Sequence, residues 1–210
     1  MKKIFKTSLF IMALFLAINA NAQDSPIQLG VKAGANMSNF SGDIKDTKAK
    51  FGFNVGVTLD YNFTPNVALL TGLEFTTKGS KIKDNEDTKD ASANAMYLQL
   101  PVHVGYKLDV AEGTKIVFHA GPYIAYGIGG KTKETYEGVK EKDDFFGSKE
   151  DGGFKRFDFG VGAGVGAEFG KIGVGLGYDF GLTNIAHKAE EGESFKVKNQ
   201  NAYLTVGYKF

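Results

Sequence analysis

Two of the three histidines stand where their side chains could meet. His103 and His119 fall in consecutive predicted strands joined by a short turn, on the faces opposite the apolar residues. With a carboxylate from Glu74 or Asp179 they could form a metal site or a proton relay. The simpler alternative, which we favour, is hydrogen bonding inside a polar interior. We therefore predict no metal ligand and no cofactor.

Other candidates for catalysis lack the arrangement that a reaction requires. A nucleophile needs an adjacent, oriented base, and no such pair is visible in the sequence. His187 precedes a glutamate-rich stretch at 190–193 with Ser194 beside it, which suits a solvated loop better than a triad. The acidic run at 84–90 lacks the spacing of a calcium loop. With a net charge of +1, we predict no enzyme, no catalytic residue and no nucleic-acid partner.

The elements that position these residues show a strict alternation of apolar and polar positions. In the C-terminal segment every even position is apolar and the last residue, Phe210, is aromatic. Alternation with period two is the signature of a β-strand that has one apolar face. The same pattern predicts eight strands, at 27–37, 51–63, 67–78, 95–108, 115–128, 156–169, 172–183 and 202–210.

The connections between these strands alternate in length. Short turns are predicted at 64–66, 109–113 and 170–171, and long loops at about 38–50, 79–94, 129–155 and 184–199. Bacterial outer-membrane barrels have short periplasmic turns, longer extracellular loops and an even number of strands, and lipid leaves no strand edge unpaired. We therefore predict an all-β, eight-stranded, antiparallel, up-and-down transmembrane β-barrel in the outer membrane.

The main alternative is a soluble β-sandwich or lipocalin-like barrel in the periplasm, with its apolar face inside. That face carries more large side chains than the interior of an eight-stranded barrel can hold. Aromatic residues also gather near the strand ends, as in the interfacial girdles of membrane barrels; examples are Phe51, Phe63, Tyr106, Phe169 and Tyr208. Both observations favour the membrane barrel.

The N-terminus resembles a targeting segment rather than part of the fold. Three lysines precede a short apolar stretch at 9–18, and an A-x-A site follows at 20–22. This arrangement predicts a secretory signal peptide at 1–22 and a barrel domain at 23–210. The chain contains no cysteine, so its stability cannot rely on disulfides.

The inward-facing residues form the chemically informative set. Charges in a narrow, poorly hydrated lumen must be paired, because an unpaired charge costs several kcal/mol. We predict an ion-pair network that plugs the barrel, with Lys32 and Lys78 also facing inward. Its predicted members are Asp60, Glu74, Lys107, Lys115, Arg156, Asp158, Glu168 and Asp179.

Glycines occupy the inward positions of two consecutive strands, at 160–166 and 173–177. Missing side chains let strands coil sharply and leave room for bulky residues opposite. A small groove along this wall is the alternative.

The loop at 129–155 interleaves many charges with aromatic residues. Long loops are usually either functional or disordered. Tyr136, Phe145 and Phe146 are therefore candidate loop contacts. The Phe145–Phe146 pair either contacts a partner or folds back over the barrel mouth, and the sequence leaves both open.

Several short motifs stand out along the chain: YLQLP at 97–101, GYKL at 105–108, GPY at 121–123, DFGLTNI at 179–185 and the aromatic terminus. They resemble motifs of the PorT-like outer-membrane β-barrel proteins of Bacteroidetes. The resemblance covers nearly all of the chain after the signal peptide. It implies an outer-membrane barrel and, for the best-known members of the family, a role in assembling a protein secretion system.

These observations predict a non-enzymatic integral outer-membrane protein with loops for partner contact, adhesion or envelope integrity. The alternatives are an accessory component of a secretion system and a narrow channel for small solutes. The expected partners are outer-membrane lipid, the barrel-insertion machinery and envelope or secretion-system proteins. We expect a monomer.

Overall fold

The computed structural model describes residues 26–210 except 45, 83–87, 137–138, 149–152 and 188–194. The predicted signal peptide at 1–22 lies outside these residues. Within the described ranges, no helix has the length and hydropathy needed to cross a membrane. The strands are β1 (Ile27–Gly42), β2 (Thr47–Asn62), β3 (Val67–Ile82), β4 (Thr88–Ala111), β5 (Thr114–Tyr136), β6 (Val139–Asp144), β7 (Phe157–Phe169), β8 (Ile172–Gly181) and β9 (Val197–Lys209).

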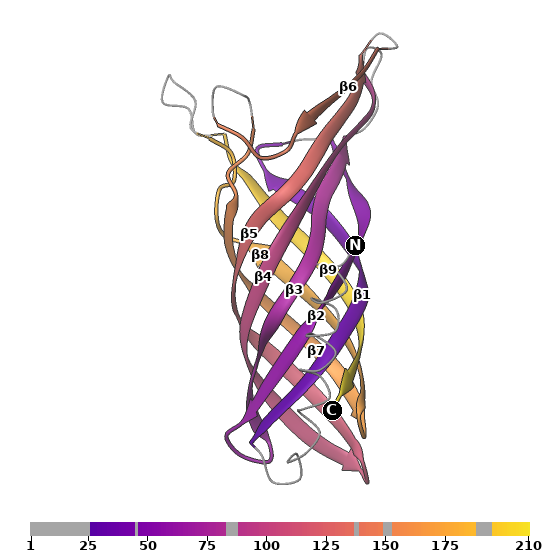
Figure 1. Ribbon diagram of the computed structural model, residues 1–210, viewed down its shortest axis with the longest axis vertical. Helices are drawn as coiled ribbons and strands as arrows, with labels where there is room; N and C mark the ends of the chain where they lie inside the picture. Colours follow the sequence, from indigo (N-terminus) through magenta and orange to yellow (C-terminus); the bar gives the residue numbers. More distant parts are fainter. Residues whose placement is uncertain (1–25, 45, 83–87, 137–138, 149–152, 188–194) are drawn as a thin grey trace, which may run out of the picture.

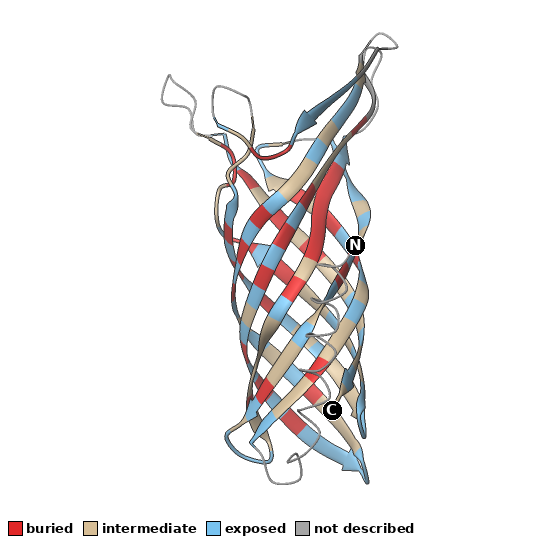
Figure 2. Cartoon of the chain, in the orientation of Figure 1, coloured by how far each residue is buried: buried red, intermediate tan, exposed pale blue. Residues whose placement is uncertain are grey.

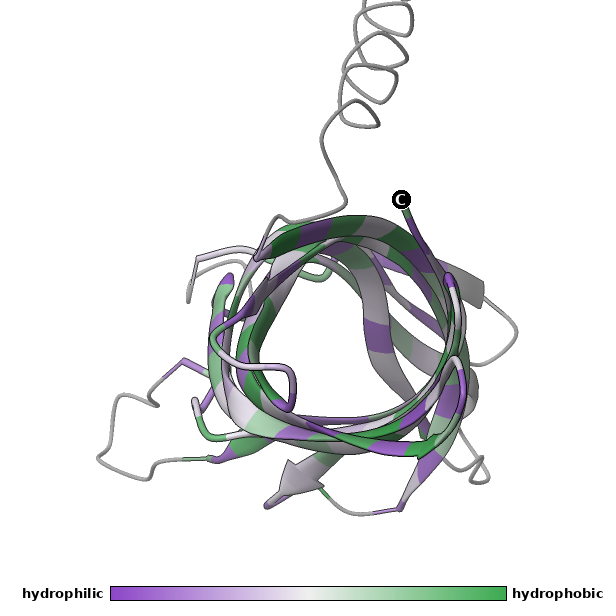
Figure 3. Ribbon diagram, turned by 90° about the horizontal axis from the view of Figure 1, so that it is seen from below, coloured by the Kyte–Doolittle hydropathy of each residue, from purple (hydrophilic) through white to green (hydrophobic). Residues whose placement is uncertain are grey.

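All strands except β6 form one closed antiparallel barrel. The strand order is β4-β3-β2-β1-β9-β8-β7-β5, and the pairing of β4 with β5 closes the ring (Figures 1 and 3). The first and last strands pair along their length, from Gly30 opposite Lys209 to Gly42 opposite Val197. The predicted eight-stranded antiparallel barrel is therefore confirmed.

The outer surface of the barrel is apolar and the inner surface is polar. Along β7, Phe157, Phe159 and Val161 are exposed, whereas Asp158 and Gly160 between them are buried. Figure 2 shows buried and exposed positions alternating along strands of the barrel. A soluble barrel would bury its apolar face, so the soluble alternative is wrong. The exposed apolar band has the orientation that lipid requires.

The strands run further than the alternation predicts, at the end with the long connections. β4 has 24 residues and β5 has 23, whereas about 9–11 residues cross a membrane. β6 then turns back and pairs with the end of β5, from Lys131 opposite Asp144 to Tyr136 opposite Val139. The expected loops at 79–94 and 129–155 are therefore partly strand. Beyond the lipid, backbone hydrogen bonds hold the strands together and no apolar face is needed.

Candidate functional site in the barrel lumen

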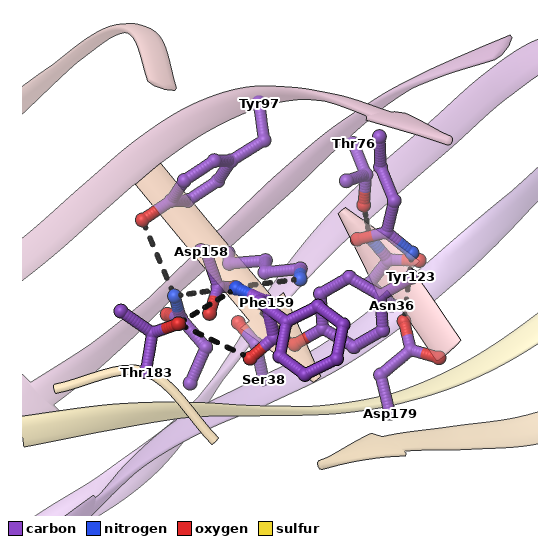
Figure 4. Close-up of polar contacts among 12 residues, drawn as sticks. Asn36, Ser38, Thr76, Tyr97, Tyr123, Asp158, Phe159, Asp179 and Thr183 are labelled. Atoms are coloured by element: carbon purple, nitrogen blue, oxygen red, sulfur yellow. Dashed lines mark hydrogen bonds and ion pairs between the residues drawn. The ribbon is translucent and has the colours of Figure 1, made fainter. Parts of the chain in front are cut away.

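The polar side chains of the lumen fall into three clusters along the barrel axis. The mouth cluster lies toward the long connections, the periplasmic cluster lies toward the short turns, and the central cluster lies between them. Each cluster joins side chains from strands that are not neighbours in the barrel. Figure 4 shows several of these contacts, including those of Tyr97, Asp158 and Asp179.

The mouth cluster centres on a fully buried ion pair. Lys78 Nζ lies 3.3 Å from Asp158 Oδ2, and neither side chain exposes any surface. Tyr123 Oη and Asn199 Nδ2 donate hydrogen bonds of 3.2 and 3.0 Å to the same carboxylate oxygen. Asn199 also donates to Tyr97 Oη, and Lys78 lies over the Tyr123 ring at 4.3 Å. A buried ion pair is tolerated only with such additional partners.

The central cluster is bridged by an amide. Lys32 Nζ lies 2.6 Å from Glu74 Oε2. Gln99 Nε2 donates to Glu74 Oε1 at 3.1 Å and to Asp179 Oδ2 at 3.0 Å. Gln99 therefore holds two carboxylates close together, and only one of them, Glu74, has a lysine within ion-pair distance among the described residues.

The periplasmic cluster is held by two lysines. Lys209 Nζ lies 2.5 Å from both Asp60 Oδ2 and Glu168 Oε1. Lys107 Nζ lies 3.2 Å from Asp60 Oδ2 and donates to Asn62 Oδ1 at 3.0 Å. The predicted network omitted Lys209, although the alternation of the last strand places it at an inward position.

Two predicted members of the network lie outside it. Lys115 pairs with Asp109 at 3.2 Å, and both side chains are partly exposed at the short-turn end of the barrel. Arg156 precedes β7 at the opposite end, where Nη1 donates to the carbonyl of Gly127 and the guanidinium lies over the Phe146 ring. The prediction is therefore wrong for these two residues. Alternation indicates which face of a strand a side chain is on, but not its position along the barrel axis.

The two predicted lumen histidines lie against each other. Their Nδ1 atoms are 2.9 Å apart, and the rings stack with their centroids 5.1 Å apart. One Nδ1 must donate and the other accept, so the contact depends on complementary tautomers. Among the described residues, no group of three or more His, Asp or Glu side chains is placed to hold a metal. His187 instead contacts the carbonyl of Gly147, and residues 190–194 lie outside the described chain.

The aromatic residues of the predicted loop close the barrel mouth. Phe145 and Phe146 are buried. Phe145 stacks on Phe154 at 4.7 Å, and Phe146 meets the edge of Tyr97 at 5.3 Å. Of the two alternatives, the one in which the pair folds back over the barrel mouth is therefore correct. Phe145 and Phe146 are not exposed loop contacts. Tyr136 ends β5, and its side chain is not among those described.

A cavity of about 180 Å³ lies in the lumen beside the central and periplasmic clusters. Gly166, Gly173 and Gly175 line it on one side, and Gln99, His103 and Asp179 are among the residues around it. An added Cβ at Gly173 would have its nearest neighbour at 3.9 Å, so the missing side chain leaves open space there. An added Cβ at Gly164 or Gly177 would instead meet the side chain of His119 or Tyr203. The glycines therefore make room for bulky residues opposite, as the main interpretation predicts, and those at the cavity also border a groove, which was the alternative.

A closed antiparallel barrel with an apolar exterior and an ion-paired polar lumen defines an integral outer-membrane protein. A family model described as "outer membrane protein beta-barrel domain" matches residues 21–187, and the chain belongs to this family. The protein is therefore located in the bacterial outer membrane. The match does not show membership of the PorT-like group that the sequence motifs resemble. No curated protein matches the sequence.

Several solved outer-membrane proteins resemble the barrel in shape. Ail, the attachment invasion locus protein of Yersinia pestis, is 16% identical, with 87% of this chain and 98% of that chain covered and a TM-score of 0.42. Neisserial surface protein A is 14% identical, with 87% and 97% covered and a TM-score of 0.46. OprG of Pseudomonas aeruginosa is 14% identical, with 88% and 94% covered and a TM-score of 0.45.

Proposed function

We propose that this protein is a non-enzymatic outer-membrane barrel with an occluded lumen, which presents a rigid extension at the cell surface for partner contact, adhesion or envelope integrity. The extension consists of the ends of β4 and β5 together with β6. β5 pairs with β4 on one side and with β6 on the other over residues 131–136. This continuous pairing is the observation that carries the proposal (Figure 1).

Most described charges of β5 and β6 in the extension are sorted between its two faces. Side chains alternate along a strand, so Lys131, Lys133 and Lys142 share one face, whereas Glu134 and Glu141 share the other. Asp144 is the exception, because it lies on the lysine face opposite Lys131. Lys133 lies directly opposite Lys142, and Glu134 lies directly opposite Glu141. Like charges in directly opposed positions destabilise a β-ribbon. Ribbon stability therefore does not account for these two like-charge pairs, and we attribute them to contact with a charged partner.

The lumen supports the non-conducting part of the proposal. The mouth cluster contains a pair with no exposed surface, and the aromatic side chains above it are buried. We further propose that the barrel is a monomer, that its lipid-facing surface contacts only lipid, and that the aromatic C-terminus is recognised by the barrel-insertion machinery. The segment at 1–22 is proposed as the signal peptide.

Complementation of a deletion strain tests the proposed function. The strain would carry either the wild-type gene or a variant in which residues 133–142 are replaced by a two-residue turn. Heat-modifiable migration in SDS would verify that both proteins form barrels. We expect the strain that carries the shortened variant to show the same defects as the deletion strain in assays of surface adhesion and detergent sensitivity. Full complementation by the shortened barrel would overturn the proposal.

A second candidate is an accessory role in protein secretion, which the PorT-like motifs at 97–101 and 179–185 favour. It predicts that deletion of the gene blocks export of specific cargo, and an unchanged secreted protein profile would exclude it. A third candidate is a narrow solute channel, which the lumen cavity favours. It predicts steady conductance in planar bilayers, whereas the occluded barrel predicts a silent bilayer.

A further inference from the structure

The lumen cavity is large enough to hold a ligand. Its volume is about 180 Å³, whereas one water needs about 10–15 Å³. The space therefore accommodates roughly 12–18 waters or a small organic molecule. Its lining combines the polar side chains of Gln99, Asp179 and His103 with the apolar side chains of Leu70 and Val117.

Among the described residues, Asp179 is the lumen carboxylate that has no lysine within ion-pair distance. Each of the other four has a lysine: these pairs are Lys32–Glu74, Lys78–Asp158, Lys107–Asp60 and Lys209–Glu168. Asp179 is only 2% exposed, and within the described part of the chain its carboxylate accepts a hydrogen bond from the amide of Gln99. A buried carboxylate without a counter-ion is unfavourable. A positive charge beside Asp179 would therefore be stabilising.

Two buried polar atoms at the cavity also lack partners. Gln99 Oε1 and His103 Nε2 make no hydrogen bond to any described residue, and both residues line the cavity. The amide nitrogen of Gln99 is committed to Glu74 and Asp179, so its oxygen remains as an acceptor. Buried acceptors are normally satisfied by protein, water or ligand.

We propose that this cavity binds a small monovalent organic cation through its ammonium group. Asp179 is the counter-ion, Gln99 Oε1 accepts one ammonium N–H, and Leu70 and Val117 contact the alkyl part. An ammonium supplies both a positive charge beside Asp179 and a donor for Gln99 Oε1. A single unpaired carboxylate selects one positive charge rather than two.

The cavity is reached from the periplasmic side. The side chains of Lys32, Glu168 and Lys209 are 23%, 17% and 15% exposed, whereas Lys78 and Asp158 at the mouth are fully buried. Solvent therefore reaches the lower clusters and not the upper one. The ligand enters past Lys209 and stops below the mouth cluster.

Calorimetric titration of the detergent-solubilised full-length barrel with n-propylammonium chloride tests this proposal. The neutral control is 1-propanol, and sodium chloride at equal ionic strength controls for charge screening. We expect saturable one-to-one binding of propylammonium and none of propanol or sodium. Asp179→Asn should weaken binding at least about tenfold, because a charge-assisted hydrogen bond is lost. Asp109→Asn, the matched change at the exposed pair with Lys115, should leave binding unchanged.

A second pair of variants does not depend on the folding of Asp179→Asn. Gly173→Val projects into the cavity, and Gly129→Val has equally open surroundings but does not line it. The first should abolish binding and the second should not, with both proteins checked by heat-modifiable migration. Equal binding by the two valine variants would overturn the proposal. Equal binding of propanol, or unchanged binding by a folded Asp179→Asn barrel, would do the same.

Discussion

Lys78 and Asp158 form an ion pair across the lumen, between strands that do not touch in the barrel wall. The pair joins β3 to β7, which are separated by β4 and β5 on the shorter way round. Tyr123 and Asn199, from two further strands, donate hydrogen bonds to the same carboxylate oxygen, Oδ2 of Asp158. One contact therefore braces opposite walls and closes the space between them.

Removal of the lysine from this pair should strongly destabilise the barrel. Lys78→Met leaves Asp158 buried without its cation, and breaking a buried pair in this way costs about 3–5 kcal/mol. Urea unfolding in detergent micelles, followed by heat-modifiable migration, measures the change. Lys131→Met disrupts the exposed pair with Asp144 and should produce no measurable change. Equal stability of the two variants would contradict a bracing role for the lumen pair.

The bridge made by Lys209 predicts a smaller effect at the other end of the barrel. Lys209→Met leaves Glu168 without a lysine, whereas Asp60 keeps Lys107. Because the bridge is partly exposed, water screens the remaining charges, and we expect a loss well below that of Lys78→Met. The same urea assay tests the order of the two variants. Lys171→Met, in the β7–β8 turn, is the control, and a loss as small as that of the control would contradict the bridge.

The parts of the fold that the sequence predicts are those in contact with lipid. Lipid requires an apolar residue at every second position, and residues 157–161 show this pattern in both sequence and structure. Above the membrane that requirement ends. The pairing of β6 with β5 therefore has no signature in a stretch that is charged on both faces.

The positions of the lumen side chains also cannot be fully predicted from the sequence. Alternation correctly predicts that Asp158 and Asp179 face the lumen, but it does not indicate where each side chain lies along the barrel axis. That position depends on the tilt and stagger of the strands. Lys115 and Arg156 were therefore assigned to the ion-pair network although they lie at opposite ends of the barrel.

The exposed pair on the extension predicts a dependence on pH. Lys131 lies 2.6 Å from Asp144, outside the membrane, and its hydrogen bond and charge lower the pKa of that carboxyl. A carboxyl with a lowered folded-state pKa stabilises the β5–β6 pairing above its unfolded pKa of about 3.9, and this contribution is lost as the pH falls through the folded value. NMR titration should place the midpoint of Asp144 below about 3.9, and Lys131→Met should raise it. Lys142→Met is the control, and an unchanged midpoint in Lys131→Met would contradict the assignment.

The aromatic closure of the mouth can be tested by cysteine labelling, because the chain has no cysteine of its own. Ala125 is buried on the inner face of β5 in the same apolar cluster as Phe146. Ala125→Cys should therefore react slowly with a membrane-impermeant maleimide applied to intact cells. Phe146→Ala removes packing worth about 3–5 kcal/mol, so the mouth should open more often and the labelling rate should rise more than about tenfold.

A second route to the same opening leaves the phenylalanine in place. An added Cβ at Gly127 would lie 2.2 Å from the Phe146 ring, so Gly127→Val must displace that ring from the mouth. Labelling of Ala125→Cys should rise in this variant as it does in Phe146→Ala. Glu141→Cys, on the exposed extension, controls for reagent access and should react fast in every background. Slow labelling of Ala125→Cys in both mouth variants, with fast labelling of Glu141→Cys, would show that the aromatic side chains do not control access to the lumen. In that case the mouth cluster below them must form the seal.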